Sequence, residues 1–193
     1  MTGIILAGGE SKRLKDKAFL KVGQKTIIEE LIAKLIQLFE EIIIVVNSSQ
    51  KFKHLGVRLI KDLIPSKGPL GGLYSGLSVS SNVHNFLIAC DMPFINPNLI
   101  KYMSQQIEDY DIVVPLTNRG FEALYAFYSI NCLEKIKKQI EAGNLKIIDI
   151  YPYFKVRYIT PREIEKFDPE GLSFFNMNTE EDLEKARKIA NLL

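Results

Sequence analysis

Short apolar runs alternate with longer segments of helical periodicity over most of this 193-residue chain. The runs lie at residues 4–6, 42–46, 57–60, 86–89 and 111–114. Their short length and continuous apolar, often β-branched composition are typical of strands that are buried on both faces of a sheet. Such strands, alternating with helices, predict an α/β fold: a three-layer, doubly wound and mostly parallel sheet.

Four helices are expected between and after these runs, at about 26–39, 97–110, 131–142 and 179–190. Thr26 and Glu29 have the spacing of a capping box at the start of the first helix, and Thr179 and Asp182 form a weaker version at the last. A further helix is expected to open at Gly71-Gly72. These signals predict where the helices begin.

The alternation loosens between about residues 117 and 173. Residues 124–128 predict a long aromatic strand that can run antiparallel, and residues 156–159 predict another. The chain contains no internal repeat and no linker rich in Pro, Gly or Ser. We therefore expect a single domain, residues 1–193, with a looser C-terminal half.

The composition is that of an ordinary soluble globular protein, with 47% hydrophobic and 25% charged residues. A net charge of +2 does not favour binding to nucleic acid or to an anionic membrane. The two cysteines cannot form a zinc cluster, and no apolar stretch approaches the length of a membrane span. These features predict a cytoplasmic protein that binds neither nucleic acid nor membrane.

The first apolar run ends in paired glycines, Gly8 and Gly9, and is followed by Arg13 and Lys17. Paired glycines allow a tight turn with open backbone N–H groups, and two cations can neutralise a polyphosphate. The sequence lacks both the P-loop pattern and the dinucleotide-binding fingerprint. A strand followed by a solvated, lysine-rich loop is the alternative interpretation.

Polar residues also follow three other runs directly: Asn47, Asp62 and Asp91. Because ligands of doubly wound sheets bind at the carboxyl ends of the strands, these residues are expected to converge on one site. A hard divalent cation is normally held by one or two carboxylates plus substrate phosphates, which is the role expected for Asp91. The alternatives are that Asp91 caps the helix near Pro97 and that Asn47 and Asp62 are turn residues.

Four segments carry a resemblance to a known family: residues 6–17, 67–77, 90–95 and 174–179. They resemble the motifs of molybdenum cofactor guanylyltransferases, which are nucleotidyltransferases with a Rossmann-like, nucleotide-diphospho-sugar transferase type of fold. The chain departs from the family pattern in two places. It is one residue shorter between Arg13 and Lys17, with Lys15 where a glycine would fall, and residues 121–123 lack a proline.

The resemblance implies roles for the matching residues. Catalysis is expected from Arg13, Lys17 and Asp91. Nucleotide binding is expected from Leu6, Ala7, Gly8, Gly9, Lys17, Asn47, Asp62, Gly71 and Asp91. Asp91 is also the expected ligand of Mg²⁺. Acceptor binding is expected from Asn176 and Asn178, which a strand at 174–179 would place on one face.

The resemblance also implies a reaction and its partners. GMP would be transferred from GTP to the terminal phosphate of Mo-molybdopterin, giving molybdopterin guanine dinucleotide and pyrophosphate. Residues 1–116 would bind the nucleotide and residues 117–193 the acceptor. Cofactor-insertion machinery and the recipient enzymes are the implied partners downstream. Two alternatives remain: a related transferase that uses CTP or a sugar-phosphate acceptor, and a non-catalytic nucleotide-binding module of the same fold.

Overall fold

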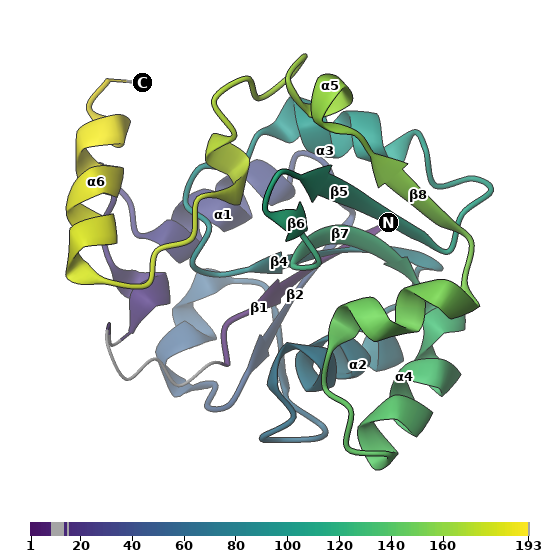
Figure 1. Ribbon diagram of the computed structural model, residues 1–193. Coiled ribbons are helices and arrows are strands. Elements are labelled where there is room, and N and C mark those ends of the chain that lie inside the picture. The colour runs from purple at the N-terminus through teal and green to yellow at the C-terminus, as the bar shows by residue number, and fades with distance from the viewer. Residues whose placement is uncertain (9–13, 15, 193) are drawn as a thin grey trace.

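The computed structural model describes residues 1–8, 14 and 16–192, and these residues form an eight-stranded sheet (Figure 1). Its strands are β1 (Thr2–Leu6), β2 (Glu41–Val46), β3 (Arg58–Lys61), β4 (His84–Ala89), β5 (Ile112–Thr117), β6 (Gly120–Phe121), β7 (Tyr125–Ser129) and β8 (Val156–Ile159). Their order in the sheet is β3-β2-β1-β4-β7-β5-β6, and β8 pairs with β5. All the predicted apolar runs are therefore strands.

The sheet is mostly parallel, as predicted. β1 lies between β2 and β4 and is parallel to both, β3 is parallel to β2, and β8 is parallel to β5. β7 is antiparallel to both of its neighbours, β4 and β5. The aromatic run at 124–128 is thus the antiparallel strand that its sequence allowed.

Helices cover both faces of the sheet and complete three layers (Figure 1). One face is covered by α1 (Ile27–Leu35), α3 (Pro97–Ser104), α5 (Pro161–Ile164) and α6 (Glu180–Ala190), and the other by α2 (Gly68–Val79) and α4 (Leu133–Glu141). Short 3₁₀ helices lie at η1 (Lys17–Phe19), η2 (Gln50–Leu55), η3 (Ile130–Cys132), η4 (Ile147–Tyr153) and η5 (Leu172–Phe174). Neighbouring strand residues alternate between the two cores: Ile4 packs with α2 and Ile5 with α1.

Two predicted helix starts are confirmed in detail. Thr26 caps α1, with the backbone N–H of Glu29 donating to Thr26 Oγ1 at 3.4 Å and that of Thr26 donating to Glu29 Oε2 at 2.9 Å. Thr179 caps α6 in the same way with Asp182. Three helices differ from the expected lengths: α1 ends at Leu35, α3 ends at Ser104, and the segment at 131–142 begins with the 3₁₀ turn η3.

The predicted strand at 174–179 is wrong. The segment forms the end of η5 and then an irregular stretch that leads into α6. The carboxylate of the buried Asp168 accepts the backbone N–H groups of Leu172 and Ser173 at 3.0 and 2.7 Å, which bends the chain into a turn. Phe174 and Met177 are buried in the core without joining the sheet. Their apolar character reflects that burial.

Helix α2 lies unusually close to β1, and Gly76 makes this approach possible. A Cβ atom at position 76 would lie 2.6 Å from Cγ2 of Ile4, which is fully buried. We expect Gly76→Ala to lower the free energy of unfolding by about 1–3 kcal/mol, because overpacking outweighs the better helix propensity of alanine. Urea denaturation measures the change. Ser78→Ala, on the exposed side of the same helix, is the control; an equal effect of the two would contradict this packing.

Glu163 joins α5 to β8 and α3. Burial raises the pKa of this carboxyl, but hydrogen bonds from Tyr102, Thr160 and Arg157 outweigh it and hold the pKa at about 2, against a usual 4.5. The Tyr102 hydroxyl donates to Oε1 at 2.5 Å, the Thr160 hydroxyl donates to Oε2 at 2.7 Å, and Arg157 forms an ion pair.

Because the pKa is lower in the folded state, this stabilisation is present above pH 4.5 and disappears as the pH falls towards 2. After allowance for solvent screening, we expect Glu163→Gln to cost about 1–2 kcal/mol at pH 7 and less at pH 2.5. Thermal unfolding at both pH values measures this. Glu165→Gln, exposed on the same turn, is the control, and a cost for Glu163→Gln that stays constant with pH would be inconsistent with this origin.

Candidate active site

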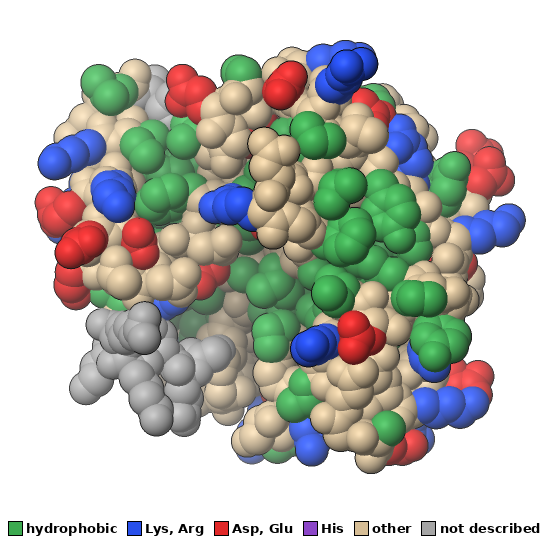
Figure 2. All heavy atoms as spheres, viewed as in Figure 1, with side chains coloured by type: hydrophobic (Ala, Val, Ile, Leu, Met, Phe, Trp, Pro, Cys, Tyr) green, Lys and Arg blue, Asp and Glu red, His purple; other side chains and the backbone are tan. Residues whose placement is uncertain are grey.

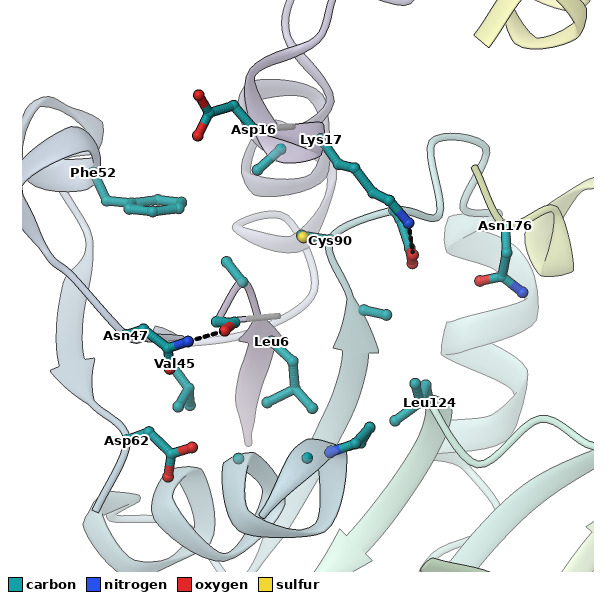
Figure 3. A pocket seen from close by; sticks show the side chains of 18 of the residues that line it. Leu6, Asp16, Lys17, Val45, Asn47, Phe52, Asp62, Cys90, Leu124 and Asn176 are labelled. Atoms are coloured by element: carbon teal, nitrogen blue, oxygen red, sulfur yellow. Dashed lines mark hydrogen bonds and ion pairs between the residues drawn. The ribbon is translucent and has the colours of Figure 1, made fainter. Parts of the chain in front are cut away.

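A cleft of about 890 Å³ lies at the carboxyl ends of the central strands (Figure 3). Residues that end or follow β1, β2, β3 and β4 line it, together with residues of η1, the start of α2 and the loop before α6. The lining includes these predicted site residues: Leu6, Ala7, Gly8, Lys17, Asn47, Asp62, Asp91, Asn176 and Asn178. The structure therefore brings nearly all of them together. Gly9 and Arg13 lie outside the described residues.

The main polar cluster of the cleft is formed by Lys17 with Asp91 and Asn178. Figure 3 shows the Lys17 side chain extending along one wall. Its Nζ lies 3.2 Å from Oδ2 of Asp91 and donates to Oδ1 of Asn178 at 2.6 Å. The side chains of Lys17 and Asp91 are only 12% and 21% exposed. This shielding strengthens their attraction compared with a surface ion pair.

The backbone on both sides holds this pair. Asp16, immediately before Lys17, has a φ of 53°, a left-handed conformation that is uncommon outside glycine, and its carboxylate accepts two hydrogen bonds from Lys51 at 2.7 Å. Asp91 follows Cys90, whose N–H donates to the carbonyl of Leu6 at 3.0 Å and so continues the sheet beyond β4. Both charged side chains thus project from fixed points.

Asp91 does not cap the following helix. The N-cap of α3 is Asn96, whose side-chain oxygen accepts the N–H groups of Asn98 and Leu99 at 2.9 and 3.2 Å. The capping alternative for Asp91 is therefore wrong. Its carboxylate remains in the cleft beside Lys17.

Cys90 also lines the cleft. Burial, with a smaller contribution from the negative charge of Asp91, raises the pKa of Cys90 to about 12. The thiol is therefore protonated at neutral pH and is a poor nucleophile. Among the described residues that line the cleft there is also no histidine. The polar groups of the described lining are therefore mainly Lys17 and its carboxylate and amide neighbours.

Asn47 and Asp62 lie on the opposite side of the cleft from Lys17 (Figure 3). The amide of Asn47 donates to the carbonyl of Gly8 and ties the first loop to the end of β2. Oδ1 of Asp62 accepts the Ser75 hydroxyl at 2.7 Å and the N–H of Ile64 at 3.1 Å. Each residue thus orders local backbone while it lines the cleft, so the turn role and a ligand role are compatible.

The Gly71-Gly72 pair does not open helix α2, contrary to the prediction. α2 begins at Gly68, not at Gly71-Gly72, because Pro69 in the first turn already fits a helix. Gly72 lines the cleft, whereas Gly71 lies behind the lining. A Cβ at position 71 would meet the carbonyl oxygen of Ile64 and Cβ of Lys67, each at 2.9 Å, so close packing explains this glycine.

Several apolar side chains also line the cleft, and the sequence motifs did not predict them. Phe19 and Phe52, with ring centroids 4.8 Å apart, form one wall together with Ala18, and Leu124 lies across the cleft. Phe52 lies on η2, between β2 and β3, and not at a strand end. The rule that selected strand-end residues could not find it.

The described residues contain no group of three or more His, Cys, Asp or Glu side chains that could enclose a metal ion. Asp91 is a suitably placed single carboxylate, and a hard cation that keeps water and phosphate ligands needs no more than one or two. The described part of the chain also has no helix long and apolar enough to cross a bilayer. On the face that Figure 2 shows, basic and acidic side chains are interspersed.

Comparison with known proteins agrees with this geometry. Residues 3–152 match the MobA-like NTP transferase domain. The chain is 40% identical to a probable molybdenum cofactor guanylyltransferase of Natranaerobius thermophilus, over 97% of this chain and 95% of the relative. It is 38% identical to the protein of the same name from Pelotomaculum thermopropionicum, over 98% and 93%.

A solved structure supports the same assignment. The molybdopterin-guanine dinucleotide biosynthesis protein A of Archaeoglobus fulgidus superimposes with a TM-score of 0.86 and 26% identity, covering 100% of both chains. The similarity therefore extends over the whole fold, including the strands that build the cleft. The chain belongs to the MobA-like NTP transferase family, among the molybdenum cofactor guanylyltransferases.

Proposed function

We propose that this protein transfers GMP from GTP to the terminal phosphate of Mo-molybdopterin, producing molybdopterin guanine dinucleotide and pyrophosphate. The names of its relatives support this reaction. The observation that carries the proposal is the Lys17–Asp91 pair in a cleft at the carboxyl ends of the strands. A cation and a carboxylate that can hold a divalent metal, placed side by side, can together compensate the negative charge of a bound triphosphate.

In this reaction an oxygen of the acceptor's terminal phosphate forms a bond to the α-phosphorus of GTP. The bond between that phosphorus and the oxygen bridging to the β-phosphate breaks, and pyrophosphate leaves with the electron pair. The attacking phosphate oxygen is already ionised at neutral pH, so the step needs no general base. This fits a cleft whose cysteine is protonated and whose described lining has no histidine.

Catalysis in this proposal is positioning and charge compensation. Lys17, with Arg13 and the backbone of Gly8 and Gly9, would balance the negative charge of the triphosphate. Leu6, Ala7, Asn47 and Asp62, which line the cleft, would hold the nucleoside. Asp62 has one carboxylate oxygen engaged by Ser75 and Ile64, so Oδ2 is the atom expected to accept a hydrogen bond from the nucleotide.

The family chemistry involves a divalent metal, and we propose Mg²⁺ with Asp91 as its protein ligand. The metal would neutralise charge on the phosphate oxygens. The site fits this group because Asp91 is a rigidly held carboxylate in the cleft, and substrate phosphates supply the other ligands Mg²⁺ prefers. Lys17 beside it would keep the carboxylate oriented when nucleotide binds.

The acceptor would lie towards the C-terminal half, residues 117–193, against the loop that carries Asn176 and Asn178. Figure 3 shows Asn176 across the cleft from Asn47 and Asp62, and Asn178 lines the cleft beside Lys17. An acceptor bound there and the nucleoside would lie on opposite sides of the Lys17–Asp91 pair. The finished dinucleotide would then pass to insertion machinery and the recipient enzymes.

Product analysis tests this proposal. Purified protein is incubated with Mg²⁺, the molybdopterin acceptor and each of the four nucleoside triphosphates, and products are identified by mass spectrometry. We expect an acceptor whose mass has increased by one GMP, from GTP alone. A CMP adduct from CTP would replace the proposal by a cytidylyl transfer, and GTP binding without any product would indicate a non-catalytic module.

A further inference from the structure

Asn178 makes a shorter contact with Lys17 than Asp91 does. Nζ of Lys17 lies 2.6 Å from Oδ1 of Asn178 and 3.2 Å from Oδ2 of Asp91. The two partners of this short hydrogen bond are 161 residues apart in the sequence. The bond therefore joins the first loop of the nucleotide side to the last loop before α6.

The hydrogen bond from Lys17 to Asn178 is of a kind that can orient the lysine ammonium. A lysine ammonium has three N–H donors and no acceptor, so Asn178 must present its amide oxygen to it. Among the described residues, Asp91 and Asn178 each engage one of those donors, and the ammonium can direct its third towards a phosphate oxygen. An amide is neutral, so it fixes the ammonium without cancelling the charge that a triphosphate needs.

The backbone of Asn178 is held from both sides. The preceding residue, Met177, is fully buried and donates its N–H to the carbonyl of Asp91 at 2.9 Å. The N–H of Asn178 donates to Oδ2 of Asp182 at 2.9 Å, within the capping box of α6, and this bond is the main cause that lowers the pKa of Asp182. The backbone at Asn178 is thus attached both to the segment that follows β4 and to α6.

Helix α6 is in turn attached to the segment that carries Lys17. The Nε of Arg187 donates to the carbonyl of Lys21 at 3.4 Å. Figure 1 shows α6 beside the early part of the chain, next to α1. The position of the Asn178 amide relative to Lys17 is therefore set by the fold.

We infer that Asn178 is a positioning residue of the nucleotide site, which aims the Lys17 ammonium at the triphosphate. This deepens the proposed function, on which it rests. It also separates Asn178, whose amide oxygen accepts from Lys17, from Asn176, whose amide NH2 group donates to the carbonyl of Phe174. The resemblance had assigned both asparagines to the acceptor.

A double-mutant cycle tests the inference. The dissociation constant of GTP with Mg²⁺ is measured by calorimetry, without acceptor, for the native protein, Asn178→Ala, Lys17→Ala and the double variant. We expect Asn178→Ala to weaken GTP binding about three- to tenfold, the value of one hydrogen bond that directs a charged group. In the Lys17→Ala background the same change is expected to have almost no further effect, because Asn178 acts through Lys17.

Asn131→Ala is the matched control, since Asn131 is exposed and its amide is bonded to Asp111 away from the cleft. Asn178 is itself exposed, so the fold is not expected to depend on it; thermal unfolding checks this, and Asn178→Leu repeats the test if alanine destabilises the loop. GTP binding by Asn178→Ala equal to that of the native protein would overturn the inference. So would an equal loss in both backgrounds, which would indicate a direct and independent contact.

Failure of the inference is distinguishable from failure of the proposed function. If the native protein binds GTP and Lys17→Ala weakens that binding, the nucleotide site stands whatever Asn178 does. If Asn178→Ala lowers only the affinity for the acceptor, Asn178 is an acceptor residue and the positioning role is refuted. If the native protein does not bind GTP, both fail.

Discussion

Lys17→Ala is expected to reduce the rate of nucleotidyl transfer by about 10²–10³-fold, the usual loss when one preorganised electrostatic group is removed. Its ammonium is largely shielded from solvent and held at fixed distances by Asp91 and Asn178. Alanine removes the charge, and it also leaves Asp91 to repel the incoming triphosphate. Both effects act on bound nucleotide, so we expect a higher KM for GTP and a lower kcat.

The rate of pyrophosphate release measures this effect. Lys138→Ala is the matched control, because Lys138 also forms an ion pair, with Glu134 at 2.6 Å, but on the exposed surface of α4. The control is expected to transfer GMP at the native rate. If Lys17→Ala retained more than about a third of the native rate, Lys17 would not be a catalytic cation.

Asp91→Asn is expected to cause a loss of similar size, about 10²–10³-fold, with nearly unchanged stability. Asparagine preserves the shape of the side chain and an oxygen for Lys17, but it removes the negative charge that a divalent cation requires. We therefore expect the concentration of Mg²⁺ needed for half-maximal rate to rise strongly. That metal dependence separates a ligand from a residue that only orients Lys17.

Asp149→Asn provides the comparison, since Asp149 is exposed and accepts a hydrogen bond from Asn144 outside the cleft. Titration of the transfer rate with Mg²⁺ is the measurement for both variants. An Asp91→Asn variant with a reduced rate but a native metal dependence would refute the metal role and leave Asp91 as a partner of Lys17.

The sequence predicted the sheet well because its central strands, β1, β2, β4, β5 and β7, are mostly buried on both faces. The run at 42–46 has five consecutive apolar side chains, and a central strand of the sheet buries all of them. This run forms most of β2. The same logic located the cleft, since residues that directly follow such strands must appear at one edge. Asn47, Asp62 and Asp91 were found in this way.

Features that depend on contacts between distant segments could not be predicted. Nothing local shows that the carboxylate of Asp168 bends the chain before Phe174, so that segment was mistaken for a strand. Phe52 reaches the cleft from η2 by packing against Phe19. The bond between Lys17 and Asn178 likewise forms only once the last helix has packed beside the segment that follows η1.

The central claim is that this cleft transfers GMP to a pterin phosphate. Its most direct test is the rate of pyrophosphate release from each of the four nucleoside triphosphates, with and without the molybdopterin acceptor, in the presence of Mg²⁺. We expect pyrophosphate release from GTP only, and only when the acceptor is present. Release that is independent of the acceptor, or equally fast from another nucleotide, would contradict it.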